Sequence, residues 1–153
     1  MVRTGVLAAV VPMLVISGCH TDAPPQNAAE EVIVLERGAL DEYSQGNPLG
    51  FVGIAADDVT WFDFTPGRQL RVEGLEAVHS LLAPLVGQIP PHTYELVEPK
   101  VQVYGDTALL TFHWSGTTTD GQPMGEWKAT SIYHWKDGAW RMVHAHWSPV
   151  DAG

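Results

Sequence analysis

Two histidines near the C-terminus, His144 and His146, are the side chains of this sequence best suited to acid/base chemistry. They lie two positions apart in an extended segment, so both imidazoles face the same side of a strand. If Asp137-Gly138 forms a two-residue turn, counting outward from it pairs His144 with Ser131 and His146 with Ala129. Small partners leave space beside an imidazole, and a neutral imidazole moves protons between substrate atoms. We therefore expect both histidines to be catalytic groups in an apolar pocket.

Alternatives remain open for these residues. Both could be core histidines whose ring nitrogens are satisfied by the backbone or by Ser131 and Ser148. Asp63 is the best carboxylate outside that strand, and it would orient one histidine or act as a base if it points inward. It could equally face solvent beside the Thr65-Pro66-Gly67 turn.

A sheet must position the histidines, and the C-terminal half predicts a long antiparallel meander with turns at Gly105-Asp106, Asp120-Gly121 and Asp137-Gly138. One predicted face is apolar and aromatic, so helices must cover it; it carries Val97, Val101, Val103, Ala108, Leu110, Phe112, Trp114, Trp127, Ala129, Ser131, Tyr133, Trp135, Trp140, Met142, His144, His146 and Ser148. The other face carries Thr111, His113, Lys128, Thr130, His134 and Arg141. The predicted ligand-binding residues are Trp61, Tyr94, Trp114, Trp127, Ser131, Tyr133 and Ser148, with core packing as the alternative for Trp61 and Tyr94.

Helices precede this sheet in the chain. Apolar residues recur at helical spacing between residues 28 and 43, while Glu36 and other charged residues lie mostly away from that stripe. A short helix is expected over 47–55, strands over 59–64 and 69–73, and a helix over 75–85 that Pro84 kinks or shortens. The predicted fold class is therefore α+β.

The first residues read as an export signal. Arg3 precedes an apolar run over 6–16, and Ile16-Ser17-Gly18-Cys19 resembles a bacterial lipobox. The resemblance implies that residues 1–18 are removed and that a lipid is attached to Cys19, the only cysteine. Residues 19–27 would then be a flexible tether, and residues 28–150 the folded domain. The alternative is an ordinary signal peptide with an incidental cysteine.

Composition limits the partners. The 153 residues carry a formal net charge of −10, which opposes binding to nucleic acid. The sequence shows no cofactor motif and no metal-ligand spacing, so we expect neither a cofactor nor a metal. A homodimer is expected through the outer sheet face, whose mixed surface includes Thr111, His113, Thr130, Ile132, Val143 and Trp147.

The order of helices followed by a meander, the segment Asp57–Asp63 and the closing segment Trp140–Ser148 resemble the nuclear transport factor two-like superfamily, close to SnoaL-like and calcium/calmodulin-dependent kinase association-domain-like proteins. The resemblance implies a cone-shaped curved antiparallel sheet packed against N-terminal helices, a cystatin-like α+β barrel, commonly dimeric. Its members include isomerases, dehydratases, cyclases and proteins with no catalytic role. In the ketosteroid-isomerase and cyclase relatives a pocket carboxylate removes a proton, whereas the late strand here offers His144, His146 and Ser148.

Two functions follow as hypotheses. The first is a protein anchored by lipid in the bacterial cell envelope, facing the periplasm or exterior, with a pocket for a small apolar ligand and acid/base chemistry of isomerase, dehydratase or hydrolase type. The second is a non-catalytic binding, dimerisation or assembly module. Convergence of Asp63, His144 and His146 on one volume would favour the first.

Overall fold

The computed structural model describes residues 23–62 and 71–150, so Cys19, Asp63 and the predicted turn at 65–67 lie outside the described residues. The elements in chain order are α1 (Ala28–Ser44), α2 (Gly50–Ile54), β1 (Ala55–Phe62), β2 (Arg71–Glu73), α3 (Leu75–Leu82), a 3-10 turn (Ala83–Leu85), β3 (His92–Tyr104), β4 (Thr107–Thr118), β5 (Pro123–Lys136) and β6 (Ala139–Pro149). The predicted helices and strands are all present, with bounds that differ by a few residues.

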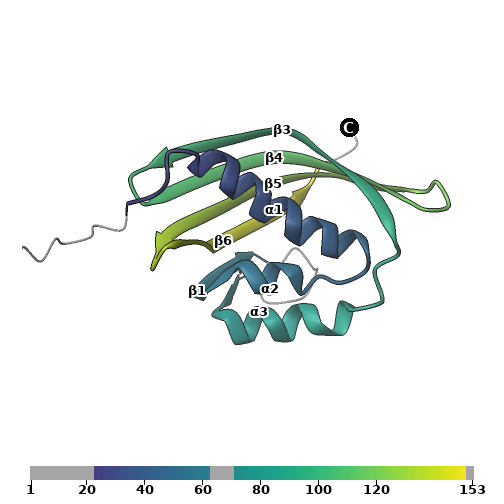
Figure 1. Ribbon diagram of the computed structural model, residues 1–153. Coiled ribbons are helices and arrows are strands. Elements are labelled where there is room, and N and C mark those ends of the chain that lie inside the picture. Colours follow the sequence, from purple (N-terminus) through teal and green to yellow (C-terminus); the bar gives the residue numbers. More distant parts are fainter. Residues whose placement is uncertain (1–22, 63–70, 151–153) are drawn as a thin grey trace, which may run out of the picture.

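The six strands form one curved sheet in the order β2-β1-β6-β5-β4-β3. Figure 1 shows α1 lying across the concave side of this sheet, with α2 and α3 below its β1 end. The predicted α+β fold with a curved sheet and N-terminal helices is therefore confirmed. One pair departs from the antiparallel expectation, because β1 runs parallel to β6.

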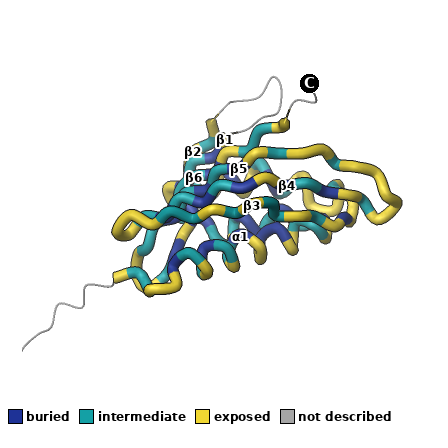
Figure 2. Tube along the Cα trace, turned by 90° about the horizontal axis from the view of Figure 1, so that it is seen from above, coloured by how far each residue is buried: buried dark blue, intermediate teal, exposed yellow. Residues whose placement is uncertain are grey.

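Helix α1 supplies the layer that covers the sheet. Val32, Ala39 and Leu40 are buried on one side of it, as helical spacing requires of a face that packs on a core. The buried side also contains Glu36, which is completely inaccessible to solvent. Figure 2 shows buried residues gathered where α1 meets the strands.

The β5–β6 hairpin begins as the sequence predicts and then changes register. Asp137 and Gly138 both have positive φ, at 53° and 79°, which is the conformation of a two-residue hairpin turn. Tyr133 pairs with Met142 as predicted, but the next pair is Ile132 with His144, so Val143 is the extra residue of a bulge.

The predicted inner-face placement of the C-terminal residues of β6 is therefore wrong. His144 pairs with Ile132 and not with Ser131, and His146 pairs with Thr130 and not with Ala129. A one-residue shift moves alternate side chains to the opposite face. Both histidines, and Ser148 opposite Lys128, lie on the outer face, while Ala145 and Trp147 face inward.

A second bulge corrects the face of Val97. Val101 pairs with Leu110 as counted from Gly105-Asp106, but Val97 pairs with His113 on the outer face. The extra residues are Glu98, whose φ is +50°, and Pro99, which has no N–H to donate to the sheet. The β4–β5 connection spans 119–122 and not two residues, although the counted pairing of Trp114 with Trp127 holds.

Among the described residues, no helix is long and apolar enough to cross a membrane.

Candidate functional site

Glu36 is a carboxyl group placed in the apolar layer between α1 and the sheet. It lies four residues after Val32 and three before Ala39, so the helix turns it toward the core. Burial raises its pKa to about 7, because an ionised carboxylate loses its hydration inside the protein. Such a group is half protonated near neutral pH, which is the condition for both accepting and giving a proton.

Two predicted ligand-binding residues of β5, Tyr133 and Ser131, surround this carboxyl. The Tyr133 hydroxyl donates a hydrogen bond of 2.5 Å to Glu36 Oε2. Burial and the adjacent carboxylate raise the pKa of Tyr133 well above its usual value, so Tyr133 remains protonated and remains a donor. The Ser131 hydroxyl also lies beside Glu36 and lowers its pKa, although the contact does not have the geometry of a good hydrogen bond.

Several inward-facing polar atoms have no hydrogen-bond partner within the described residues. They are Glu36 Oε1, Ser131 Oγ, His92 Nε2 and the indole nitrogens of Trp114, Trp140 and Trp147. Buried polar groups are nearly always satisfied, and each exception calls for an occupant such as water or a ligand. These buried atoms therefore remain available for hydrogen bonds to water or to a ligand.

Aromatic rings make up much of the remaining interior. Phe51 of α2 contacts Trp61 and Trp147 edge to face, with ring centroids 5.6 and 6.3 Å apart. Tyr43 of α1 contacts Phe51 at 6.2 Å and Trp114 at 6.4 Å. The predicted residues Trp61 and Trp114 are thus inside, where flat apolar rings would contact an apolar ligand.

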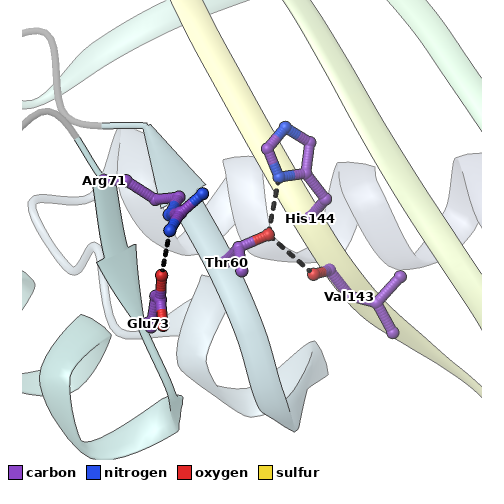
Figure 3. A network of polar contacts seen from close by, with 5 residues as sticks. All are labelled: Thr60, Arg71, Glu73, Val143 and His144. Atoms are coloured by element: carbon purple, nitrogen blue, oxygen red, sulfur yellow. Dashed lines mark hydrogen bonds and ion pairs between the residues drawn. The ribbon is translucent and has the colours of Figure 1, made fainter.

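The predicted catalytic histidines occupy a different place. His144 Nδ1 lies 2.7 Å from the Thr60 hydroxyl on β1, and its other ring nitrogen points away from that contact (Figure 3). The Phe62 ring lies 5.2 Å from the ring centroids of both His144 and His146. Partial burial, and then the neighbouring His146, lower the pKa of His144. This pair is a cluster on the outer face and does not converge with Glu36.

The remaining predicted site residues lie nearer the edges. Tyr94 donates a 2.7 Å hydrogen bond to Asp41 and ties β3 to α1, and burial raises its pKa. The Trp127 indole is half-buried and donates to the Met124 carbonyl at 3.5 Å. Within residues 23–62 and 71–150, no three His, Cys, Asp or Glu side chains are grouped so as to hold a metal ion.

Sequence reasoning missed Glu36 and His92. The signal for Glu36 was present, since its spacing from Val32 and Ala39 places it inside the apolar stripe. The signal for His92 was weak, because a histidine after Pro90-Pro91 resembles a loop residue until the strand that follows it is known.

Several solved structures of other proteins share the fold of this chain. A solved structure of a ketosteroid isomerase candidate from Parabacteroides distasonis is 30% identical, covers 83% of this chain and 91% of its own, and has a TM-score of 0.70. A nuclear transport factor two-like protein of unknown function from Pseudomonas putida is 26% identical, with coverages of 84% and 91% and a TM-score of 0.72. The hub homology domain of the calcium/calmodulin-dependent kinase of Chlamydomonas reinhardtii is 26% identical, with coverages of 81% and 99% and a TM-score of 0.65.

No protein with a curated description matches the sequence. Solved structures described as having a cystatin-like fold share the architecture at 10% and 18% identity. Residues 38–152 match the SnoaL-like domain family, which is more than half of the chain. One of these similar structures is described as a ketosteroid isomerase candidate, and another as nuclear transport factor two-like. This chain belongs to the SnoaL-like family.

Proposed function

We propose that this protein binds a small, largely apolar carbonyl compound between α1 and the sheet, and that Glu36 moves a proton on it in an isomerase- or dehydratase-type reaction. The observation that carries the proposal is the Glu36 carboxyl, fully buried, held at one oxygen by Tyr133 and without a partner at the other. A carboxyl kept in an apolar interior with a pKa of about 7 lowers stability at neutral pH, which is characteristic of a functional group.

The two oxygens of Glu36 would have separate roles. Tyr133 holds Oε2, so Oε1 faces the reacting carbon. Ionised Glu36 takes a proton from the carbon next to the carbonyl, and the electron pair of that C–H bond forms an enolate. The proton then returns to a different carbon, which gives an isomer, or to a departing hydroxyl group, which gives dehydration and a water molecule. Glu36 ends in its starting state in both cases.

The negative charge of the enolate needs a donor in the same interior. Ser131 Oγ is buried and has no hydrogen-bond partner within the described residues. Its hydroxyl lies two residues from Tyr133 on the same face of β5. A donor already in place stabilises charge that develops in the transition state, because it does not need to reorganise. Ser131 is therefore assigned to the enolate oxygen in this proposal.

Exchange of hydrogen for deuterium tests the proposal without knowledge of the natural substrate. Cyclohexanone in D2O is followed by proton NMR as its α-hydrogens are replaced, with wild-type protein and with Glu36→Gln. We expect the variant to lose about 100-fold or more of the exchange rate, the range typical of a removed acid/base group. Glu30→Gln, at an exposed position of the same helix, is the matched control. Exchange that is equal in wild type and Glu36→Gln, or absent in both, would overturn the proposal.

The cellular place and the assembly are also proposals. Lipid attachment at Cys19 would anchor the domain in the bacterial envelope, facing the periplasm or exterior, and Cys19→Ser should abolish lipid labelling and leave the precursor uncleaved. Unchanged labelling or processing would contradict the anchor.

A homodimer through the outer sheet face is supported by the mixed surface of Thr111, His113, Thr130 and Ile132. His144 and His146 lie on the same face.

A further inference from the structure

His92, at the start of β3, presents a bare ring nitrogen to the interior. Its Nδ1 lies 2.8 Å from the Pro90 carbonyl oxygen. Because a carbonyl only accepts hydrogen bonds, Nδ1 carries the hydrogen, and Nε2 of the neutral ring is an acceptor. The residue is 6% exposed, and within the described residues Nε2 has no partner. A buried acceptor held in one orientation is thus ready for a donor that the described chain does not supply.

Trp114 supplies the complementary group. Its Nε1–H is a donor, is buried and also has no partner within the described residues. The His92 and Trp114 ring centroids are 5.7 Å apart, and the Tyr43 ring lies 5.3 Å from that of His92. The two nitrogens do not bond to each other although their rings are in contact. A hydroxyl is the smallest ligand group that satisfies both, since it donates to Nε2 and accepts from Nε1–H.

The indole of Trp114 lies over Gly116, the residue next but one in the strand. A Cβ added to Gly116 would lie 2.2 Å from the Trp114 ring. The ring therefore occupies the space that a side chain at position 116 would take, and only glycine permits this placement.

This pair lies in the same layer as Glu36. Tyr43 follows Glu36 by seven residues on α1, which is two turns along the same face and about 10 Å of helix. We propose that His92 and Trp114 form a second polar subsite, which takes a hydroxyl group of a ligand whose other end reaches Glu36. The inference rests on the proposed function and names the ligand class as an apolar compound with a carbonyl at one end and a hydroxyl at the other.

Phenol and toluene test the subsite, because they have nearly the same shape and differ in the hydroxyl. Binding is measured by NMR from the Trp114 indole N–H and from the His92 ring nitrogens. We expect phenol to bind at least about tenfold more tightly than toluene and to shift both signals, since a site built for a hydroxyl rejects the analogue without it. His92→Asn retains a donor for the Pro90 carbonyl and removes the acceptor at Nε2, so the preference should disappear. Trp114→Phe should reduce it, and His113→Asn on the outer face should leave it unchanged.

Three results would overturn the subsite. They are equal binding of phenol and toluene, absence of binding by either, and a phenol preference that survives His92→Asn. In each case His92 Nε2 and Trp114 Nε1 would hydrogen-bond to water and not to a ligand hydroxyl. Failure of the subsite and failure of the proposed function are distinguishable. Cyclohexanone exchange that depends on Glu36, without a hydroxyl preference, would leave the proposed function standing. A hydroxyl preference that depends on His92, without exchange, would leave a binding subsite and no catalysis.

Discussion

Tyr133 and Glu36, 97 residues apart in the chain, are joined by a 2.5 Å hydrogen bond from the tyrosine hydroxyl to the carboxyl. The bond connects β5 to α1 inside the cone. It satisfies one carboxyl oxygen and leaves the other without a partner in the described residues. The core is thereby interrupted by a titratable group at its centre.

Replacing Glu36 with Gln should stabilise the protein at alkaline pH. The pKa of Glu36 rises from 4.5 to about 7 on folding, so the folded state favours the protonated form. Below pH 4.5 the free energy of unfolding of the wild type is therefore not lowered relative to Glu36→Gln by ionisation. As the pH rises from 4.5 through about 7, the wild type loses up to about 3 kcal/mol relative to the variant. Urea unfolding at pH 5 and pH 8 measures the difference between wild type and variant.

Glu30→Gln, which is exposed, should change stability by only a few tenths of a kcal/mol at either pH. If Glu36→Gln altered the free energy of unfolding equally at pH 5 and pH 8, Glu36 would not titrate between them.

Gly116→Ala should disturb the interior through Trp114. The new Cβ would lie 2.2 Å from the indole, so the ring must move, at a cost of about 1–3 kcal/mol for overpacking. Thermal unfolding measures the loss, and the indole N–H resonance of Trp114 should shift. Gly53→Ala is the control, because nothing lies within 4 Å of its added Cβ. An unchanged melting temperature and an unmoved Trp114 resonance in Gly116→Ala would contradict this packing.

The sheet was predictable where turn chemistry and alternation act together. Asp137-Gly138 specifies its turn, and pairs next to that turn follow by counting, as Tyr133 with Met142 shows. The bulge at Val143 has no local signal, because no glycine or proline marks it, so every later residue of β6 was placed on the wrong face.

The candidate site was predictable only in part. Ser131, Tyr133 and Trp114 follow from alternation and lie inside, as expected of apolar and small residues on a covered face. Trp61, a pocket candidate with core packing as the alternative, is buried too. Glu36 was missed because a charged residue on a helix is normally exposed. Its burial depends on Tyr133, a partner that only the tertiary fold brings to it.

The pKa of His144 on the outer face should depend on its neighbour His146. The pKa of His144 lies below 6.5, first because of partial burial and second because of His146. The neutral ring is favoured in the folded state, so this contribution to stability is present above pH 6.5 and lost as the pH falls through the lowered value. His146→Asn should raise the His144 midpoint partway toward 6.5, as measured by NMR of the ring hydrogens. A His144 midpoint that is the same with and without His146 would contradict the coupling.

Ile132→Lys should separate the proposed dimer. Ile132 lies between Leu109 and His144 across the outer face, and a buried lysine without a partner opposes association. Light scattering should give twice the chain mass for wild type and the single mass for the variant. Val34→Lys, at a position that is 67% exposed on α1, should remain dimeric. A wild-type monomer at high micromolar concentration would contradict the dimer.

The proton-exchanging role proposed for Glu36 is tested most directly by carboxyl-carbon NMR of the glutamate side chains. One glutamate, absent from the spectrum of Glu36→Gln, should titrate with a midpoint near pH 7, in agreement with its pKa of about 7. Tyr133→Phe should move that midpoint higher, because the hydrogen bond from Tyr133 lowers the pKa. A Glu36 midpoint below about pH 5, in the ordinary range of solvent-exposed carboxyls, would contradict the account.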